Sequence, residues 1–292
     1  MQPKRLQPQC LQCLVGKQLP DFLIDQPQEK QLEYLQRLMK LLSDLPHTCA
    51  GPVVMQDIRK LRQEMFGYSQ DFSEIKEYFN RLMMSREAEA ANTIASADDP
   101  LLCAVQHSLI GNYIDFGSHH SVKEDELDEM LRKVHSASVD RDAYARFRHD
   151  AENSRRILLL TDNCGEIVLD KLLVKAIQKL NPNAEVTVMV RGEAVQNDAT
   201  FEDAKQVGMT EIAKVIGNGN DIAGTWEPAL SVEAAHALDA ADMIIAKGQA
   251  NFETLCHCGR NVHYLFLCKC QMFAQRFGVP RLTSMLVHDS CC

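Results

Sequence analysis

The chain has 292 residues, of which 46% are hydrophobic and 24% are charged, and its formal net charge is −9. A chain of this length can form one large domain or two ordinary ones, and this composition is typical of a globular protein. The negative charge argues against non-specific binding to nucleic acid, which requires clustered lysine and arginine. Small phosphorylated ligands stay compatible with it, because a few well-placed residues can bind them against the overall sign.

The sequence also bears on the compartment of the protein. Residues 1–14 are polar and lack the apolar core of a secretory signal, and no run approaches the roughly 20 apolar residues of a membrane span. Eleven cysteines in such a chain favour reduced thiols or metal ligands over disulfides. We therefore expect a cytoplasmic protein with neither a membrane nor a nucleic-acid partner, and the sequence makes no prediction of its oligomeric state.

Near the start of the chain, Cys10 and Cys13 form a Cys-x-x-Cys pair. Such a pair can be half of a zinc site or a redox couple. No second pair follows at a standard zinc-finger spacing, so packing or surface thiols are the alternative. The later cysteines could join the pair in a second soft-metal site, or could simply be reduced thiols near a buried strand and the chain end: Cys256, Cys258, Cys268, Cys270, Cys291 and Cys292.

The pattern of apolar residues divides the chain at about residue 150. Up to that point apolar residues recur at helical spacing, and beyond it short apolar runs alternate with helical segments. The predicted strands are Ile157–Leu160, Glu185–Val190, Lys214–Ile216, Met243–Ala246 and His263–Leu267. The expected fold is α/β, with a helical region (residues 1–150) packed on a three-layer α/β/α catalytic domain (residues 151–292) that has a mostly parallel sheet.

The first predicted strand ends in a polar turn. Asp162 and Asn163 follow it directly, and Gly165 precedes a long amphipathic helix. Ligands of open α/β sheets bind at the carboxyl ends of the strands. An oxygen-rich pair beside a helix N-terminus suits a hard cation together with an anionic ligand.

Three more polar loops follow predicted strands and should reach the same edge of the sheet: Arg191–Asp203, Gly217–Thr225 and Lys247–Asn251. Each alone could be an ordinary turn, because Asn-Asp and Gly-Asn-Gly are common turn sequences. The glycine fingerprints of dinucleotide-binding and P-loop proteins are missing. The convergence of several such loops on one edge is what indicates a site.

Taken together, these segments resemble the damage-control phosphatases, metal-dependent enzymes formerly grouped as domain of unknown function 89. The matching segments are Asp162–Glu166 with Asp170, Arg191–Gly192, Asn197–Thr200, Glu202–Asp203, Lys247–Asn251 and Gly111–Gly117. The Cys-x-x-Cys pair resembles the shorter prokaryotic branch of that family. The resemblance covers nearly the whole chain.

The resemblance implies roles for individual residues. A divalent metal (manganese, nickel, cobalt or magnesium) is expected at Asp162, Asn163 and Asp198. The residues implied in substrate and phosphate binding are Glu166 as an acid, Lys247 and Lys269 as phosphate-contacting lysines, Gly248 and Asn251 within the lysine motif, and Asn112 and Asp115 from the helical region.

The expected function is that of a phosphatase that hydrolyses small phosphorylated metabolites, such as sugar phosphates or damaged phosphocofactors, with metal-activated water. Glu166 or Asp198 would orient that water. A metal- and phosphometabolite-binding protein without efficient turnover is one alternative. An S-adenosylmethionine-dependent methyltransferase is another, with fold-level support alone. Cys164 beside the helix start could be a nucleophilic thiolate or a small buried turn residue.

Overall fold

The computed structural model describes residues 6–16, 23, 25–46, 48–114 and 124–291. The chain forms two compact units, Met1–Asp71 and Phe72–Cys292. In the first unit, helices α1 (Pro8–Gly16), α2 (Gln28–Ser43) and α3 (Gly51–Phe66) enclose a small core of their own. Tyr34 and Leu38 of α2 and Val54 and Ile58 of α3 are fully buried there, each pair at the four-residue spacing of one helix face.

The second unit contains a six-stranded sheet in the order β3-β2-β1-β4-β5-β6. Its strands are β1 (Arg156–Leu160), β2 (Glu185–Val190), β3 (Lys214–Gly217), β4 (Met243–Lys247), β5 (Val262–Leu267) and β6 (Ser284–His288). The first five run parallel, and β6 pairs antiparallel with β5. The chain order reverses between β1 and β4, and this switch point is where open α/β sheets bind their ligands.

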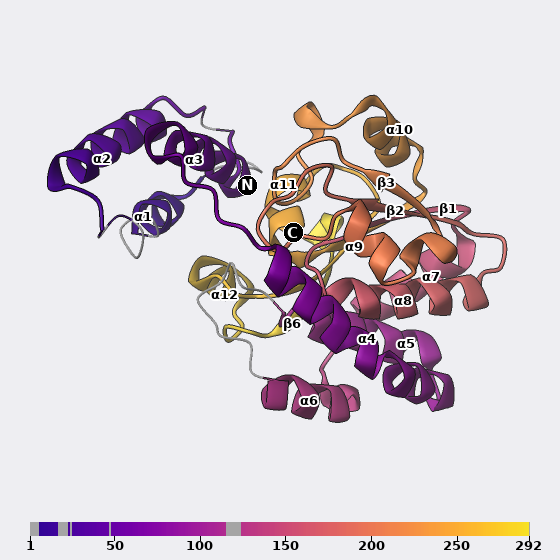
Figure 1. Cartoon of the computed structure of the whole chain (residues 1–292). Helices are drawn as coiled ribbons and strands as arrows, with labels where there is room; N and C mark the ends of the chain where they lie inside the picture. Colours follow the sequence, from indigo (N-terminus) through magenta and orange to yellow (C-terminus); the bar gives the residue numbers. More distant parts are fainter. Residues whose placement is uncertain (1–5, 17–22, 24, 47, 115–123, 292) are drawn as a thin grey trace. The chain divides into compact units, whose positions relative to one another are not determined.

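Helices cover both faces of the sheet because alternate strand residues point to opposite sides. Ile157 and Leu159 of β1 face one core, while Leu158 and Leu160 face the other. The first core is closed by α4 (Ser73–Ser96), α5 (Pro100–Gly111), α7 (Arg141–Asn153), α8 (Glu166–Leu180) and α9 (Phe201–Gln206). The second is closed by α10 (Val232–Ala240), α11 (Gly248–Leu255) and α12 (Gln271–Phe277), and α6 (Glu124–Arg132) lies beside α5 (Figure 1).

The structure confirms the predicted fold class, a three-layer α/β arrangement with a mostly parallel sheet. All five predicted strands are present, and β6 is an additional strand that the sequence pattern did not predict. The secondary structure changes from helical to alternating between Asn153 and Arg156, whereas the compact units divide at Asp71. No helix in the described ranges is long and apolar enough to cross a membrane.

Candidate active site

The turn after β1 places Asp162 and Asn163 at the switch point of the sheet. Asp162 Oδ2 accepts hydrogen bonds from Asn112 Nδ2 at 2.9 Å and from Asn163 Nδ2 at 2.8 Å. Asn163 Nδ2 also donates to Glu166 Oε2 at 2.8 Å, so one amide group bridges two carboxylates. Gly165 ends the turn with φ +73°, where a Cβ would lie only 3.1 Å from the Phe79 carbonyl oxygen. Glycine is required there by both conformation and space.

The loop after β2 pairs with this turn and thereby delivers Asp198. The Ala199 N–H donates to the Asp162 carbonyl oxygen at 2.7 Å, and the Cys164 N–H donates to the Asn197 carbonyl oxygen at 2.8 Å. These bonds form a short antiparallel bridge between Asn163 and Asp198. Two loops far apart in sequence thus place the three predicted metal ligands next to one another.

Arg191 fixes the orientation of Asp198. Its Nε donates to Asp198 Oδ2 at 2.6 Å, and one of its terminal nitrogens donates to the Thr161 carbonyl oxygen at 3.1 Å. The guanidinium group is fully buried, so it acts at low dielectric on a carboxylate that is almost as buried. This buried ion pair anchors the second loop to the end of β1.

Beside the turn, Lys247 joins two further buried carboxylates. Its Nζ lies 3.0 Å from Glu166 Oε1 and 3.2 Å from Asp170 Oδ1, and it donates to the Ser108 carbonyl oxygen at 2.6 Å. The Ser108 hydroxyl donates to Asp170 Oδ1 at 2.7 Å. An ammonium group has three N–H donors, and all three have acceptors here.

Burial raises the pKa of Asp170 to about 7, although the Lys247 ammonium acts to lower it and the Glu166 carboxylate adds to the rise. Asp170 Oδ2 is a buried oxygen with no hydrogen-bond partner among the described residues. Burial alone would lower the pKa of Lys247, but the carboxylates of Asp170 and Glu166 raise it above its ordinary value. Lys247 is therefore a permanent cation whose charge compensates two acids.

Gly248 brings the backbone of β4 and α11 directly against Asp162. Its φ is +77°, and a Cβ on this residue would lie 1.9 Å from Asp162 Oδ2. Asn251, one turn further along α11, donates to the Thr161 carbonyl oxygen at 3.0 Å and to that of Lys247 at 2.6 Å. Its Oδ1 accepts from the Thr225 hydroxyl at 2.8 Å. Asn251 thus ties the ends of β1 and β4 together across the switch point.

The helical segment before the sheet contributes Asn112, which follows α5. Its Nδ2 reaches both Asp162 and Glu166, and its Oδ1 accepts the Leu267 N–H at the end of β5 at 2.9 Å. The side chain is fully buried. One amide group therefore connects the helical layer, the carboxylates and the last parallel strand.

Residues 6–285 match the damage-control phosphatase ARMT1-like domain. The chain belongs to this family. The damage-control phosphatase of Archaeoglobus fulgidus is 29% identical over 283 residues, which span 94% of this chain and 96% of that protein. A damage-control phosphatase of Pyrococcus horikoshii is 35% identical over 179 residues, or 61% of each chain.

The fold is shared with a solved structure of the same family. A DUF89 family protein from Pyrococcus horikoshii has a TM-score of 0.79 and 27% sequence identity, covering 98% of this chain and 99% of that chain. The damage-control phosphatase names of the relatives support a phosphatase-type activity for this chain. The glycines of the loops after β2 and β3 do not support the methyltransferase alternative. A Cβ on Gly192 would lie 2.4 Å from the Gly219 backbone nitrogen, so these two glycines serve close packing of two loops.

The oxygen atoms in the turn after β1 and the loop after β2 fit a divalent cation. Asp162, Asn163 and Asp198 offer carboxylate and amide oxygens, the ligands preferred by hard cations, and all three side chains are buried. Gly248 leaves space at the Asp162 carboxylate that any side chain would fill. Acids also exceed cations in this buried cluster: Asp162, Glu166, Asp170 and Asp198 against Arg191 and Lys247. A bound cation would offset that excess.

Most of the predicted site residues that the structure describes meet at this one place. Asp115 lies outside the described residues. Lys269 is half-buried, and its backbone N–H donates to Gln249 Oε1 at 3.2 Å, beside the start of α11. Cys164 is a fully buried turn residue, and burial raises the pKa of its thiol, which argues against a thiolate nucleophile.

Two residues of the site, Asn80 and Ser108, were not identified from the sequence. Asn80 Oδ1 accepts the Gly165 N–H at 2.7 Å, and its Nδ2 donates to Asp203 Oδ1 at 2.9 Å. It therefore links the turn after β1 to the N-terminus of α9. Both residues sit in helices where a single small polar residue is unremarkable, so only their full burial in the fold reveals them.

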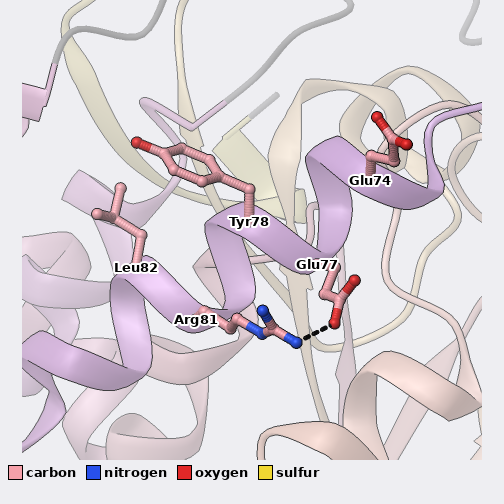
Figure 2. Close-up of a pocket in the computed structure, with 5 residues that line it drawn as sticks. All are labelled: Glu74, Glu77, Tyr78, Arg81 and Leu82. Atoms are coloured by element: carbon pink, nitrogen blue, oxygen red, sulfur yellow. Dashed lines mark hydrogen bonds and ion pairs between the residues drawn. The ribbon is translucent and has the colours of Figure 1, made fainter.

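The structure also has an open hollow of about 370 Å³ on α4, which is unrelated to the predicted site. Its lining residues all come from one face of that helix, and Glu77 and Arg81 form an ion pair there (Figure 2). No buried acid or amide converges on it. The cysteine pair gives no further sign of a metal centre, since Cys10 is half-buried, Cys13 is exposed and, within the described residues, neither belongs to a cluster of metal-ligand side chains.

Proposed function

We propose that this protein is a divalent-metal-dependent phosphatase acting on small phosphorylated metabolites, such as sugar phosphates or damaged phosphocofactors. The observation that carries the proposal is the buried group of Asp162, Asn163 and Asp198 at the switch point of the sheet. The phosphatase names of the relatives support the reaction class. No disulfide joins the ten described cysteines, which supports work in a reducing cytoplasm.

Asp162, Asn163 and Asp198 would hold the metal, which when bound polarises phosphoryl oxygens and lowers the pKa of water. Manganese, nickel, cobalt and magnesium all suit the proposal. Asn112 and Asn163 donate to Asp162 and hold its carboxylate in one orientation. Arg191 does the same for Asp198.

Glu166 is our candidate for orienting the attacking water. Its carboxylate accepts from Asn112 and Asn163, the same amides that hold Asp162, so it is fixed directly beside that predicted metal ligand. Asp198 is the alternative, and its Oδ2 accepts from Arg191. Lys247 Nζ lies 3.0 Å from Glu166 Oε1 and holds that carboxylate in place. A carboxylate held this way can accept a hydrogen bond from water at a fixed position.

We propose a role for Lys247 other than the predicted phosphate contact. Binding a phosphate oxygen would require its Nζ to give up one of three buried acceptors. We assign it to positioning Glu166. Lys269, which is half-buried beside the start of α11, is left as the lysine that contacts phosphate.

The decisive experiment compares the wild-type protein with Asp162→Asn on a panel of sugar phosphates and phosphocofactors, each with manganese, nickel, cobalt or magnesium. Removal of one metal-ligating carboxylate should lower kcat/KM by about a thousand-fold, because metal stabilisation of the transition state contributes several kcal/mol. Asp142→Asn, on an exposed part of α7, is the matched control and should keep full activity.

Chelation of the wild-type protein should abolish phosphate release, and returning the metal should restore it. Activity that persists after thorough chelation, or full turnover by Asp162→Asn, contradicts the proposal. Metal-dependent binding of a phosphometabolite without release of phosphate would instead establish a binding protein.

A further inference from the structure

A second group of metal-ligand side chains lies at the other end of the sheet. Asp150 of α7, His263 of β5 and His288 of β6 come together there. One carboxylate oxygen and one ring nitrogen from each histidine lie within 4.8 Å of one another. Among the described residues, this is the one group of at least three histidine, cysteine or acidic side chains with that geometry.

The topology of the sheet creates this group. His263 and His288 are directly opposite each other in the antiparallel pair of β5 and β6, so their side chains share a face. That face packs on α7, where Phe147 contacts the His263 ring and Asp150 lies one turn further along. His263 is the second residue of β5, and Leu267 ends that strand beside Asn112, so roughly 13 Å of strand separates the group from the phosphatase site.

His263 carries an unsatisfied nitrogen in this group. Its side chain is fully buried, and its Nε2 lies 2.8 Å from Asp150 Oδ2. A neutral imidazole donates from Nε2 to that carboxylate, which leaves Nδ1 as an acceptor. Nδ1 has no hydrogen-bond partner in the described part of the chain. Buried polar atoms are nearly always satisfied, so a fully buried imidazole with one bare nitrogen, next to a second imidazole and a carboxylate, is incompletely hydrogen-bonded. A metal held by Asp150 and Nε2 would replace their hydrogen bond and leave the ring proton on Nδ1.

The surroundings keep both imidazoles neutral. Burial lowers the pKa of His263 to about 4. Burial, followed by the positive charge of Arg146, lowers the pKa of His288. Metal binding requires the unprotonated ring, and here it is already present at neutral pH. Asp150 also lies in the last turn of α7, where the helix dipole favours a nearby cation.

We propose that Asp150, His263 and His288 form a separate binding site for a zinc-class transition metal. Two imidazoles and one carboxylate are a typical donor set for zinc, and three protein ligands leave a position for solvent. Asp150 gives access, since its side chain is 18% exposed. His288 now contacts the Ser290 N–H through Nδ1 at 3.1 Å and Asn261 Oδ1 through Nε2 at 2.9 Å. The metal replaces one of these contacts, and the other holds the ring.

The consequence of binding is a clamp between α7 and the antiparallel edge of the sheet. Because the ligands come from three elements, the unfolded chain lacks the site, and zinc should raise the thermal unfolding midpoint. This inference is independent of the phosphatase proposal. Its ligand preference also differs, since nitrogen donors select zinc over magnesium.

The test measures zinc by equilibrium dialysis, and cobalt by its visible absorption, in the full-length wild-type protein, Asp150→Asn, His288→Gln and Asp162→Asn. Wild type should bind about one equivalent of zinc that magnesium does not displace. Asp150→Asn and His288→Gln should weaken this binding by more than the roughly 10- to 100-fold typical of residues that merely orient a ligand. Asp162→Asn should keep it, which separates the site from the phosphatase turn.

His149→Ala is the matched control, because His149 is an exposed histidine next to Asp150 on the same helix. It should leave zinc binding and the cobalt spectrum unchanged. Unaltered zinc binding in Asp150→Asn overturns the proposal, as does loss of all zinc in Asp162→Asn alone. If circular dichroism shows that His288→Gln is unfolded, Asp150→Asn decides the matter, since it keeps the shape of a partly exposed side chain.

Discussion

The two ends of the sheet present opposite chemistry. At the carboxyl ends of β1 and β4, loops and helix starts gather carboxyl and amide oxygens and buried basic side chains. At the other end, strand residues and the last turn of a helix present neutral imidazoles beside one acid. Loops at a switch point can converge from several strands, whereas side chains within strands meet only their neighbours in register. One sheet can thus carry a site with oxygen ligands at one end and a site with imidazole ligands at the other, and the two sites share no residue.

The variant with the largest expected effect tests whether the site at the carboxyl ends of the strands needs Lys247 to balance its buried acids. Lys247→Met keeps the bulk of the side chain but leaves Glu166 and Asp170 without their cation. We expect a loss of about 3–5 kcal/mol in the free energy of unfolding, the usual result of removing one partner of a buried ion pair. Urea unfolding measures it.

Two further variants sharpen that result. Adding Asp170→Asn to Lys247→Met should recover part of the lost stability, because one uncompensated charge disappears. At the opposite end, Asp150→Asn in metal-free protein should cost no more than about 1 kcal/mol, since its side chain is partly exposed. Equal losses for Lys247→Met and Asp150→Asn would remove the distinction between the two ends.

The next effect tests the steric fit at Asp162. Gly248→Ala places a Cβ on the Asp162 carboxylate and should lower activity by about a hundred-fold, because a displacement of 1 Å in a reacting site has that cost. Gly259→Ala is its control. Gly259 has φ +75° and no heavy atom within 4 Å of an added Cβ, so it shares the backbone strain of about 1–3 kcal/mol without the clash.

Both glycine variants should therefore lose stability, and phosphatase assays should separate them. Equal activity in Gly248→Ala and Gly259→Ala would mean that Asp162 tolerates displacement. In that case the close approach of Gly248 would be a packing feature of α11.

The smallest expected effect is a pH dependence of the free energy of unfolding that comes from Asp170, at the carboxyl ends of the strands. A carboxyl group titrates near pH 4 in an unfolded chain, whereas burial raises the pKa of Asp170 to about 7. Between these values the folded protein holds a proton that the unfolded chain has released. The contribution of Asp170 to stability is thus present below about pH 4 and is lost as pH rises through about 7.

Asp170→Asn should flatten this part of the stability profile. The measurement is the free energy of unfolding of both proteins at about pH 5 and about pH 8, spanning the upper part of that window. Parallel profiles for wild type and variant would show that Asp170 titrates normally.

Much of the fold and of the carboxyl-end site could be predicted from the sequence. Strand periodicity located five strands, and the rule that parallel strands end at one edge brought Asp162, Asp198 and Lys247 together before any coordinates. The contacts of Lys247 could not be foreseen. Its acceptors come from α5 and α8, and their depth of burial depends on helix packing, which periodicity does not specify.

The opposite end was not predicted at all. His263 and His288 each belong to an apolar run, and Asp150 belongs to an amphipathic helix, so none of them stands out locally. They meet because β6 returns antiparallel beside β5, and β6 was not identified from the sequence. Only the register of two strands makes these histidines neighbours.

Asn112 has a consequence for how this chain could be cut or recombined. It precedes the sheet in the chain, yet it donates to Asp162 and accepts from Leu267, which lies 155 residues later. A fragment that begins at residue 151 would carry the six described strands together with Asp162, Asn163 and Asp198, but it would lack Asn112 as a donor to Asp162. The segment that carries the strands therefore lacks part of the proposed site. Transfer of its loops to another sheet would also require the turn after α5, which contains Asn112.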